Sequence, residues 1–169
     1  MDYLETVRLA SKGDAGAFSQ LIHERKEDIY RIAYSYVKNR EDALDIVSET
    51  VYKAFISVRK LKSPEYFNTW LTRILINCAI DHLKKNRRTV SLEISAAEMD
   101  GVDRTELMDL YSAIDNLEEK QKSVVILKYL NDLTISEVSE ILQVPLGTVK
   151  TILHKALREL RLELKEEER

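Results

Sequence analysis

Residues 134–160, TISEVSEILQVPLGTVKTILHKALREL, decide the fold of the C-terminal part of the chain. Thr134 is followed three residues later by Glu137, and this pair forms a capping box that predicts the start of a helix. The turn-like residues 143–146 (QVPL) then interrupt the helical periodicity,. The stretch therefore predicts two short helices joined by a turn of four residues.

The two helices are predicted to present different faces. In the first helix we expect four residues to be buried: Ile135, Val138, Ile141 and Leu142. In the second helix a narrow inward stripe follows the spacing i, i+4, i+7, i+11: Val149, Leu153, Ala156 and Leu160,. Polar and basic side chains of the second helix point away from that stripe: Thr148, Lys150, Thr151, His154, Lys155, Arg158 and Arg161,.

This pattern is typical of a helix-turn-helix, in which the second helix enters the major groove of DNA. Cations on that helix can contact phosphates and guanine edges, and Thr or aliphatic groups can meet thymine methyls. A packed helical hairpin with a solvated outer face is the alternative. The capping box, the short turn and the cation cluster together favour DNA binding.

The composition favours an all-α fold. The 169 residues include 4 Gly and 2 Pro and are rich in Leu, Ile, Lys, Glu and Arg,. No apolar run is long enough to span a bilayer, and the N-terminal residues have no signal-peptide core,. The single cysteine, Cys78, cannot form an internal disulfide, which favours the reducing cytoplasm,.

Residues 89–106 (TVSLEISAAEMDGVDRTE) are acidic and lack sustained helical periodicity. We predict that they link two small helical domains, residues 1–88 and 107–169. The second domain is expected to begin with helices at 107–116 and 118–129. The relative arrangement of the two domains is not predicted by the sequence.

Three helices are predicted in the first domain. Asp14 and Asn39 are expected N-caps, and Ser63 followed by Pro64 predicts the start of a third helix that runs to about Asn86,. The first two helices are expected to bury Phe18, Leu21, Ile22, Ile29, Ile32, Ala33, Ala43, Ile46, Val47, Thr50, Val51 and Ala54,. The third is expected to bury Phe67, Leu71, Ile74, Leu75 and Cys78.

Within a chain of net charge −3, residues 59–88 carry 8 cations and 2 anions. The cations flank Tyr66, Phe67 and Trp70. Cations can follow a nucleic-acid backbone while aromatic faces stack on unpaired bases, so this block suits single-stranded DNA. Both Phe67 and Trp70 can instead be core residues, and for Phe67 the core is the favoured position.

The acids Asp42, Asp45 and Glu49 lie at i, i+3 and i+7 on one helix face, which a solvated surface explains equally well,. No catalytic or metal-binding pattern is present in the sequence. The histidines His23, His82 and His154 lie in separate segments, and we expect each to be an isolated surface residue,. We therefore expect no catalytic residues, metal or cofactor, and predict that the chain is not an enzyme.

Three motifs carry a resemblance to a known family. Residues 117–164, with the string Gly147-Thr148-Val149-Lys150, resemble domain four of the bacterial extracytoplasmic-function (ECF) sigma factors. Residues 42–49 (DALDIVSE) are similar to the helix by which that family binds core RNA polymerase. The pattern from Phe67 through Trp70, Arg73 and Asn77 to Asp81, with its basic tail, is similar to the family's −10 recognition helix. By these motifs, in this order, the chain is identified as a member of the family.

The resemblance implies which residues of this sequence form the binding sites. Polymerase binding would use Asp42, Asp45, Ser48 and Glu49. The −10 element would be melted and held by Arg59, Lys60, Lys62, Tyr66, Trp70, Arg73, Asn77, Lys84, Lys85, Arg87 and Arg88. The loop around residues 59–66 would accept a flipped promoter base, and the helix at 148–161 would read a −35 duplex.

The resemblance also implies partners. These are core RNA polymerase, promoter DNA and an anti-sigma factor, typically membrane-anchored, with no small-molecule substrate. The acidic linker would thread toward the polymerase active-site and RNA-exit channels. The sequence departs from the family pattern at Leu44, Ser48, Pro145 and Ile152, where an acid, a Gln, a capping Ser and an Arg are common.

The expected function is therefore that of a transcription initiation factor. It would give RNA polymerase its promoter specificity, while the polymerase performs the chemistry. A helix-turn-helix regulator that binds duplex DNA without polymerase is the second reading, and a helical adaptor with no DNA role is the third. Co-elution with core polymerase separates the first reading from the second, and duplex binding at low salt separates the second from the third.

Overall fold

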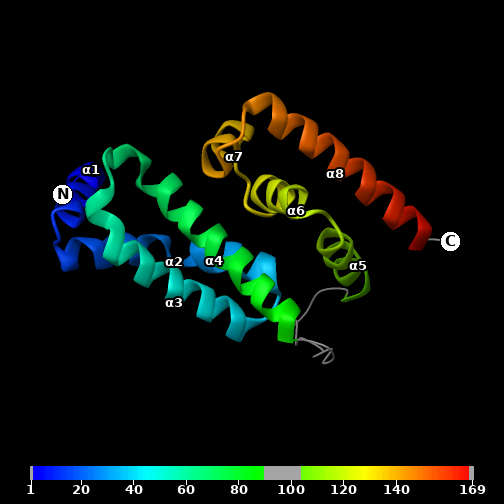
Figure 1. Cartoon of the computed structure of the whole chain (residues 1–169), viewed down its shortest axis with the longest axis horizontal. Coiled ribbons are helices and arrows are strands. Elements are labelled where there is room, and N and C mark those ends of the chain that lie inside the picture. The colour runs from blue at the N-terminus through cyan, green and yellow to red at the C-terminus, as the bar shows by residue number, and fades with distance from the viewer. Residues whose placement is uncertain (1, 90–103, 168–169) are drawn as a thin grey trace. The chain divides into compact units, whose positions relative to one another are not determined.

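A computed structural model describes residues 2–89 and 104–167. Within these ranges every regular element is a helix, which confirms the predicted all-α fold. The chain forms two compact units, Met1–Glu93 and Ile94–Arg169, drawn in blue to green and in yellow to red in Figure 1. Most of the predicted linker lies outside the described residues. Of its ends, Thr89 belongs to a helix of the first unit and residues 104–106 to a helix of the second.

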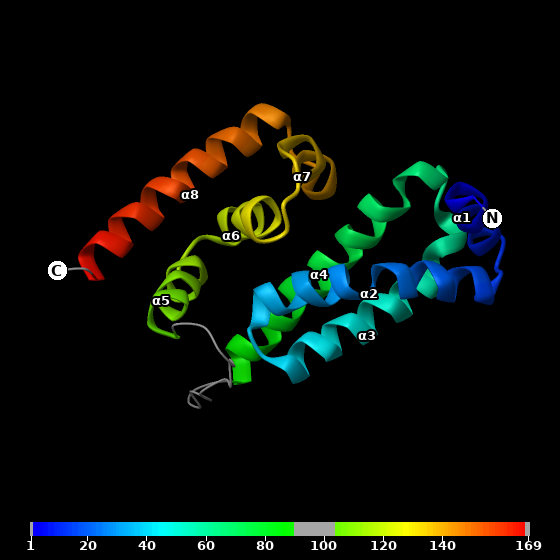
Figure 2. The same cartoon turned by 180° about the vertical axis from the view of Figure 1, so that it is seen from behind.

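The first unit contains α1 (Tyr3–Ser11), α2 (Ala15–Val37), α3 (Arg40–Ser57) and α4 (Phe67–Thr89). Helices α2, α3 and α4 pack on one another, as both views show (Figures 1 and 2). Both predicted N-caps are confirmed, because Asp14 accepts a hydrogen bond from the Ala17 amide at 2.9 Å and Asn39 from the Asp42 amide at 3.0 Å. Helix α1 was not predicted from the sequence.

Between α3 and α4 the chain makes two short 3₁₀ turns, η1 (Val58–Lys60) and η2 (Pro64–Tyr66). The prediction that Ser63 caps the long helix is wrong, since its side chain makes no capping hydrogen bond. Instead the Tyr66 amide donates to the Ser63 carbonyl at 3.1 Å, and α4 begins at Phe67. Backbone pairing in the 3₁₀ turn satisfies an amide that a side-chain cap would otherwise serve.

Most of the predicted core residues of the first unit are buried, including Leu21, Ile46, Phe67 and Cys78. Burial raises the pKa of the Cys78 thiol, so it stays protonated. Four residues predicted to be buried are only partly so: Ile22, Val47, Val51 and Ile74. For two of them, Ile22 and Val51, the reason is an open groove described below.

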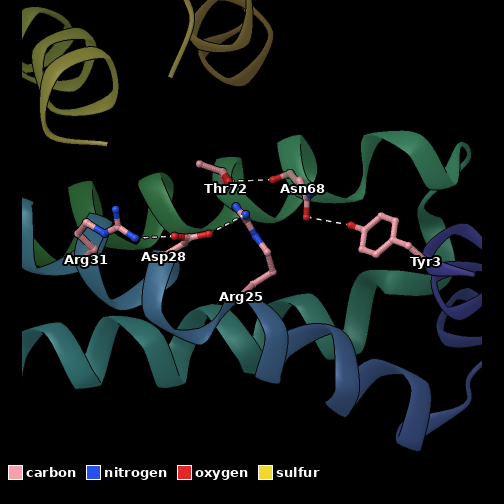
Figure 3. A network of polar contacts seen from close by, with 6 residues as sticks. All are labelled: Tyr3, Arg25, Asp28, Arg31, Asn68 and Thr72. Atoms are coloured by element: carbon pink, nitrogen blue, oxygen red, sulfur yellow. Dashed lines mark hydrogen bonds and ion pairs between the residues drawn. The ribbon is translucent and has the colours of Figure 1, made fainter. Parts of the chain in front are cut away.

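Figure 3 shows two groups of polar contacts, one between α1 and α4 and one within α2. The Tyr3 hydroxyl donates to Asn68 Oδ1 at 2.9 Å, and burial raises the pKa of Tyr3. On α2, Asp28 accepts hydrogen bonds from Arg25 at 2.8 Å and from Arg31 at 2.7 Å. The Tyr3–Asn68 bond fixes α1 against the start of α4, next to the 3₁₀ turns.

The second unit contains α5 (Arg104–Asp115), α6 (Glu119–Val125), η3 (Ile126–Leu130), α7 (Ile135–Leu142) and α8 (Leu146–Glu167). The predicted capping box is confirmed: the Thr134 amide donates to Glu137 at 2.7 Å, and the Glu137 amide to the Thr134 hydroxyl at 3.1 Å. The helix predicted at 118–129 differs in its second half. Residues of η3 form a π-helix, and Asn131 Nδ2 donates to the Ile126 carbonyl at 2.9 Å.

The turn between α7 and α8 is shorter than predicted, because Leu146 is already the first residue of α8. Gln143 ends α7 in a left-handed conformation, with φ of 56°. The Val144 amide then donates to the Ser139 carbonyl at 3.2 Å. This closes the end of α7 and turns the chain directly into the next helix.

Candidate nucleic-acid interface

Helix α8 has one buried and one exposed side. The predicted inward stripe is confirmed, with Val149, Leu153, Ala156 and Leu160 all buried. All seven residues predicted to face DNA are exposed: Thr148, Lys150, Thr151, His154, Lys155, Arg158 and Arg161. Within the described part of the chain, none of the four cations among them is ion-paired, so their charge is available to a polyanion.

The N-terminal turn of α8 begins with the ordinary first helical bond and has no side-chain cap from Pro145,. Pro145 offers no side-chain acceptor, but its carbonyl accepts from the Val149 amide at 3.0 Å. The Thr151 hydroxyl donates to the Gly147 carbonyl at 3.0 Å within the same turn. With that proton used inside the helix, Thr151 can offer a partner its methyl group and a hydroxyl acceptor, but not the donor.

Around the 3₁₀ turns, the cations Arg59, Lys60 and Lys62 are exposed, and so is the ring of Tyr66. Phe67 is fully buried, as favoured from the sequence. Trp70 is half-buried and packs on Phe67 with ring centroids 5.7 Å apart. Of the aromatics in the basic block, Tyr66 is therefore the one whose face is most open to a base.

Further along α4 the predicted residues Trp70, Arg73, Asn77 and Lys84 follow the spacing i, i+3, i+7, i+14, which places them on one side of the helix,. Lys84, Lys85 and Asn77 are exposed and Arg73 is partly buried. Arg87 and Arg88 lie in the last turns of α4, but their side chains are outside the described part of the structure. The residues predicted to contact the −10 element thus extend from the 3₁₀ turns along one side of α4.

The acidic residues of α3 differ in their exposure and in the contacts that their side chains make. Asp45 and Ser48 are exposed. Glu49 pairs with Lys53 at 2.9 Å, and the hydrogen bond from Lys53 lowers the pKa of Glu49. Asp42 lies 3.4 Å from the Nε2 atom of His82 on α4.

The prediction that His82 is an isolated surface residue is wrong. Its side chain is only 18 % exposed and lies between Asp42 and Asn86, whose Nδ2 atom is 3.1 Å from its Nε2. The reason is the packing of α3 on α4, which joins residues 40 positions apart in the chain. Sequence spacing carries no signal for such a pair.

An open apolar groove of about 600 Å³ runs between α2 and α3. Phe18 and Ile22 line it from α2, and Ser48, Val51, Tyr52 and Phe55 from α3. Tyr52 is 65 % and Phe55 50 % exposed, although the Phe55 ring meets Phe18 edge-on at 5.3 Å. Sequence reasoning missed this surface. The feature of the sequence that could have revealed the groove is the set of large apolar residues of α3 that lie outside its buried stripe.

Within the described residues, no group of three or more His, Cys, Asp or Glu side chains is gathered in a way that could hold a metal ion. None of the helices that the structure describes is long and apolar enough to cross a membrane.

Comparison with known families adds to this geometry. Sigma-70 region 2 matches residues 21–89, and Sigma-70 region 4 matches residues 107–160. Together the two matches cover more than half of the chain. The chain belongs to the sigma-70 family. It is of the ECF type, and its function is promoter-specific transcription initiation with RNA polymerase.

Curated relatives align with nearly the whole of this sigma factor. This chain is 38% identical over 150 residues to the RNA polymerase sigma factor SigV of Bacillus subtilis (strain 168), and the alignment covers 87% of this chain and 90% of SigV. It is 29% identical to the ECF RNA polymerase sigma factor SigW of the same organism, with 95% of each chain covered.

Two solved structures share the fold. One is CnrH in complex with the cytosolic domain of CnrY, with a TM-score of 0.77, 21% identity and 97% of each chain covered. The other is the sigma factor RpoE in complex with the anti-sigma factor NepR from Bartonella quintana, with a TM-score of 0.68 and 23% identity, covering 88% of this sigma factor and 96% of RpoE. The region 2 match begins at residue 21, so α1 and the start of α2 lie outside it.

Proposed function

We propose that this sigma factor divides promoter recognition between its two units. Residues 107–169 would read the −35 element as duplex DNA through the exposed face of α8. Residues 1–88 would bind core RNA polymerase and melt and hold the −10 element. The chain itself would carry no catalytic step, and it would act in the cytoplasm, where the polymerase and the chromosome lie.

The observation that carries the −35 assignment is the two-sided character of α8. Its cations have no ion-pair partner in the described part of the chain, and its opposite stripe is buried. A helix of this kind, presented after a tight turn, fits the major groove. Lys150, Lys155, Arg158 and Arg161 would contact phosphates or guanine edges, with Thr148, Thr151 and His154 between them.

The −10 assignment is supported by the exposed cations of residues 59–62, the exposed Tyr66 ring and the aligned side of α4. Arg59, Lys60 and Lys62 would follow the backbone of the melted strand, while Tyr66 stacks on an unpaired base. Trp70, Arg73 and Asn77 would continue this surface along α4. Lys84, Lys85, Arg87 and Arg88 would supply the adjacent duplex with cationic contacts.

For polymerase docking, Ser48 lines the apolar groove between α2 and α3, and the exposed Asp45 lies about one helical turn before it, whereas Glu49 pairs with Lys53. We propose that the acids and the groove form one docking surface for core polymerase. Apolar side chains such as Tyr52 and Phe55 would provide buried area, and the acids would fix orientation. Asp42, paired with His82, would contribute less than Asp45.

We also propose control by an anti-sigma factor, membrane-anchored as is common in the family. The support is the resemblance of the fold to RpoE, solved in complex with the anti-sigma factor NepR. An anti-sigma factor that competes with polymerase would cover part of the docking surface.

The function is tested by run-off transcription with core polymerase, with and without this sigma factor, on a library of promoter sequences. Enrichment of templates that share a −35 and a −10 motif is expected. No enrichment, together with no co-elution with core polymerase, would refute the proposal.

The docking surface is tested with Asp45→Arg and Tyr52→Ser, both at exposed positions, so that neither change disturbs the fold. Each should weaken binding to core polymerase in a co-elution or fluorescence titration. Glu27→Arg, a charge reversal on the exposed part of α2, is the matched control and should bind normally. Full affinity in both test variants would show that polymerase docks elsewhere.

A further inference from the structure

Gly13 lies between α1 and α2 in a conformation that other residues rarely adopt, with φ of 103°. Its amide donates to the Ala10 carbonyl at 2.9 Å, and the next amide, of Asp14, donates to the Leu9 carbonyl at 3.1 Å. These bonds close the C-terminus of α1 tightly. The turn therefore presents bare backbone on its outer surface, with no side chain at residue 13.

The guanidinium of Arg59 occupies the space next to this backbone. A Cβ atom placed on Gly13 would lie 2.5 Å from Arg59 Nη2, 3.1 Å from Cζ and 3.2 Å from Nε. Any other residue at position 13 would therefore have to displace the guanidinium. Because the contacting atoms are the end of a flexible side chain, displacement and not unfolding is the expected response.

Two physical effects favour this position of Arg59. The bare turn leaves open to the guanidinium the space that a Cβ at residue 13 would fill, and the C-terminal end of α1 carries a partial negative charge that favours a cation. Within the described ranges no hydrogen bond or ion pair involves the Arg59 side chain. Its five N–H donors are thus free for a ligand while the side chain stays in place.

We propose that Gly13 is a positioning residue for promoter opening, and that it preorganises Arg59 to bind a backbone phosphate of the melted −10 strand. The proposal rests on the −10 role proposed above for Arg59. An exposed arginine normally loses much rotamer freedom when it binds, and a side chain that is already seated loses less. Gly13 would therefore affect DNA although it does not contact it.

The test is a double-mutant cycle with Gly13→Ala, Arg59→Ala and the double variant. The template is the most active promoter selected from the library, and the measurement is the fraction of heparin-resistant complexes formed with core polymerase. We expect Arg59→Ala to lower that fraction by about tenfold, the scale of losing one hydrogen-bonded contact between charged groups. Gly13→Ala should lower it severalfold, and it should add nothing when Arg59 is already alanine.

Equal losses from Gly13→Ala in both backgrounds would show that Gly13 acts on the fold alone, which overturns the inference while the role of Arg59 stands. No loss from Gly13→Ala beside an intact Arg59 overturns it as well. No loss from Arg59→Ala would instead refute the −10 role of Arg59, and the inference with it.

Two controls accompany the cycle. Gly16→Ala adds the same methyl group in the first turn of α2, near Asp14 Oδ1 and not Arg59, and should leave promoter opening unchanged. If Gly13→Ala does not fold, as judged by thermal unfolding, Gly13→Asn takes its place, because asparagine tolerates positive φ better and still carries a Cβ. Affinity for core polymerase should be the same in every variant.

Discussion

Glu49 and Asp45 lie on the same helix but are held differently. Glu49 is paired with Lys53 at 2.9 Å, whereas Asp45 has no such partner in the described part of the chain. An exposed pair of this type contributes little to stability, about 0.3–0.5 kcal/mol. A partner can therefore displace Lys53 at small cost, and Asp45 is available without any displacement.

The Glu49–Lys53 pair predicts a pH effect. The folded-state pKa of Glu49 lies below its usual value of 4.5. The stability that the ionised Glu49 gains from Lys53 is therefore fully present above pH 4.5 and is lost as the pH falls through the folded-state pKa,. The difference in free energy of unfolding between the unaltered chain and Lys53→Ala should therefore shrink on acidification below 4.5. Denaturant unfolding at several pH values measures it. Lys60→Ala removes an exposed lysine that has no ion pair within the described residues, and it should show no such change. A parallel response would exclude the Glu49–Lys53 pair as the cause.

The outward residues of α8 should affect activity and not stability. Arg158→Ala and Lys155→Ala leave no cavity, and each should weaken −35-dependent transcription by the loss of one DNA contact, roughly 1–3 kcal/mol for a base-reading arginine. A phosphate-contacting lysine should also lower the salt slope by about one. Leu153→Ala, in the buried stripe, should instead cost roughly 2–5 kcal/mol of unfolding free energy. Thermal unfolding and run-off transcription distinguish the two classes, and full activity of both outward variants would exclude this face from DNA reading.

At the scale of elements, α7 depends on its cap because it is short. Ile135–Leu142 spans only about two turns, and an isolated helix of that length is not stable,. Two backbone amides at its start are satisfied through the Thr134–Glu137 capping box. The cap and the packing of α7 on α8 together hold the turn that positions α8.

Loss of the capping hydroxyl should therefore be measurable. Thr134→Ala is expected to destabilise the second unit by about 1 kcal/mol, which corresponds to a fall in Tm of roughly 4–8 °C for a domain of this size. Calorimetry of the whole chain measures it. Ser136→Ala removes an exposed hydroxyl from the same turn and should leave Tm nearly unchanged. Equal shifts for the two variants would show that the capping box adds no stability.

At the scale of the whole molecule, the net charge and the division of the chain into two units predict weak DNA binding by the free sigma factor. The net charge is −3, and the cations are divided between two compact units. Core polymerase would fix the spacing of the units and so raise the effective concentration of the second contact. We therefore expect a free chain to bind a −35 duplex no more tightly than micromolar at physiological salt, by fluorescence anisotropy. Sub-micromolar specific binding would contradict this.

The sequence by itself determined those features that depend on neighbours in the chain. The capping residues Asp14, Asn39 and Thr134 and the rotational phase of α8 were all predicted correctly, because a cap and a 3.6-residue period involve only residues within a few positions. The short α1 was missed although its nine residues are amphipathic, with Val7 and Ala10 buried; the bond from Tyr3 holds it against α4.

Only the tertiary structure decided how distant segments meet. The Asp42–His82 pair, the groove beside Phe55 and the seat of Arg59 on Gly13 each join residues from different helices or turns. No local pattern encodes these contacts, because they arise from the packing of α1 to α4 against one another. The same packing left Ile22 partly exposed, although its helical position places it with the buried residues of α2.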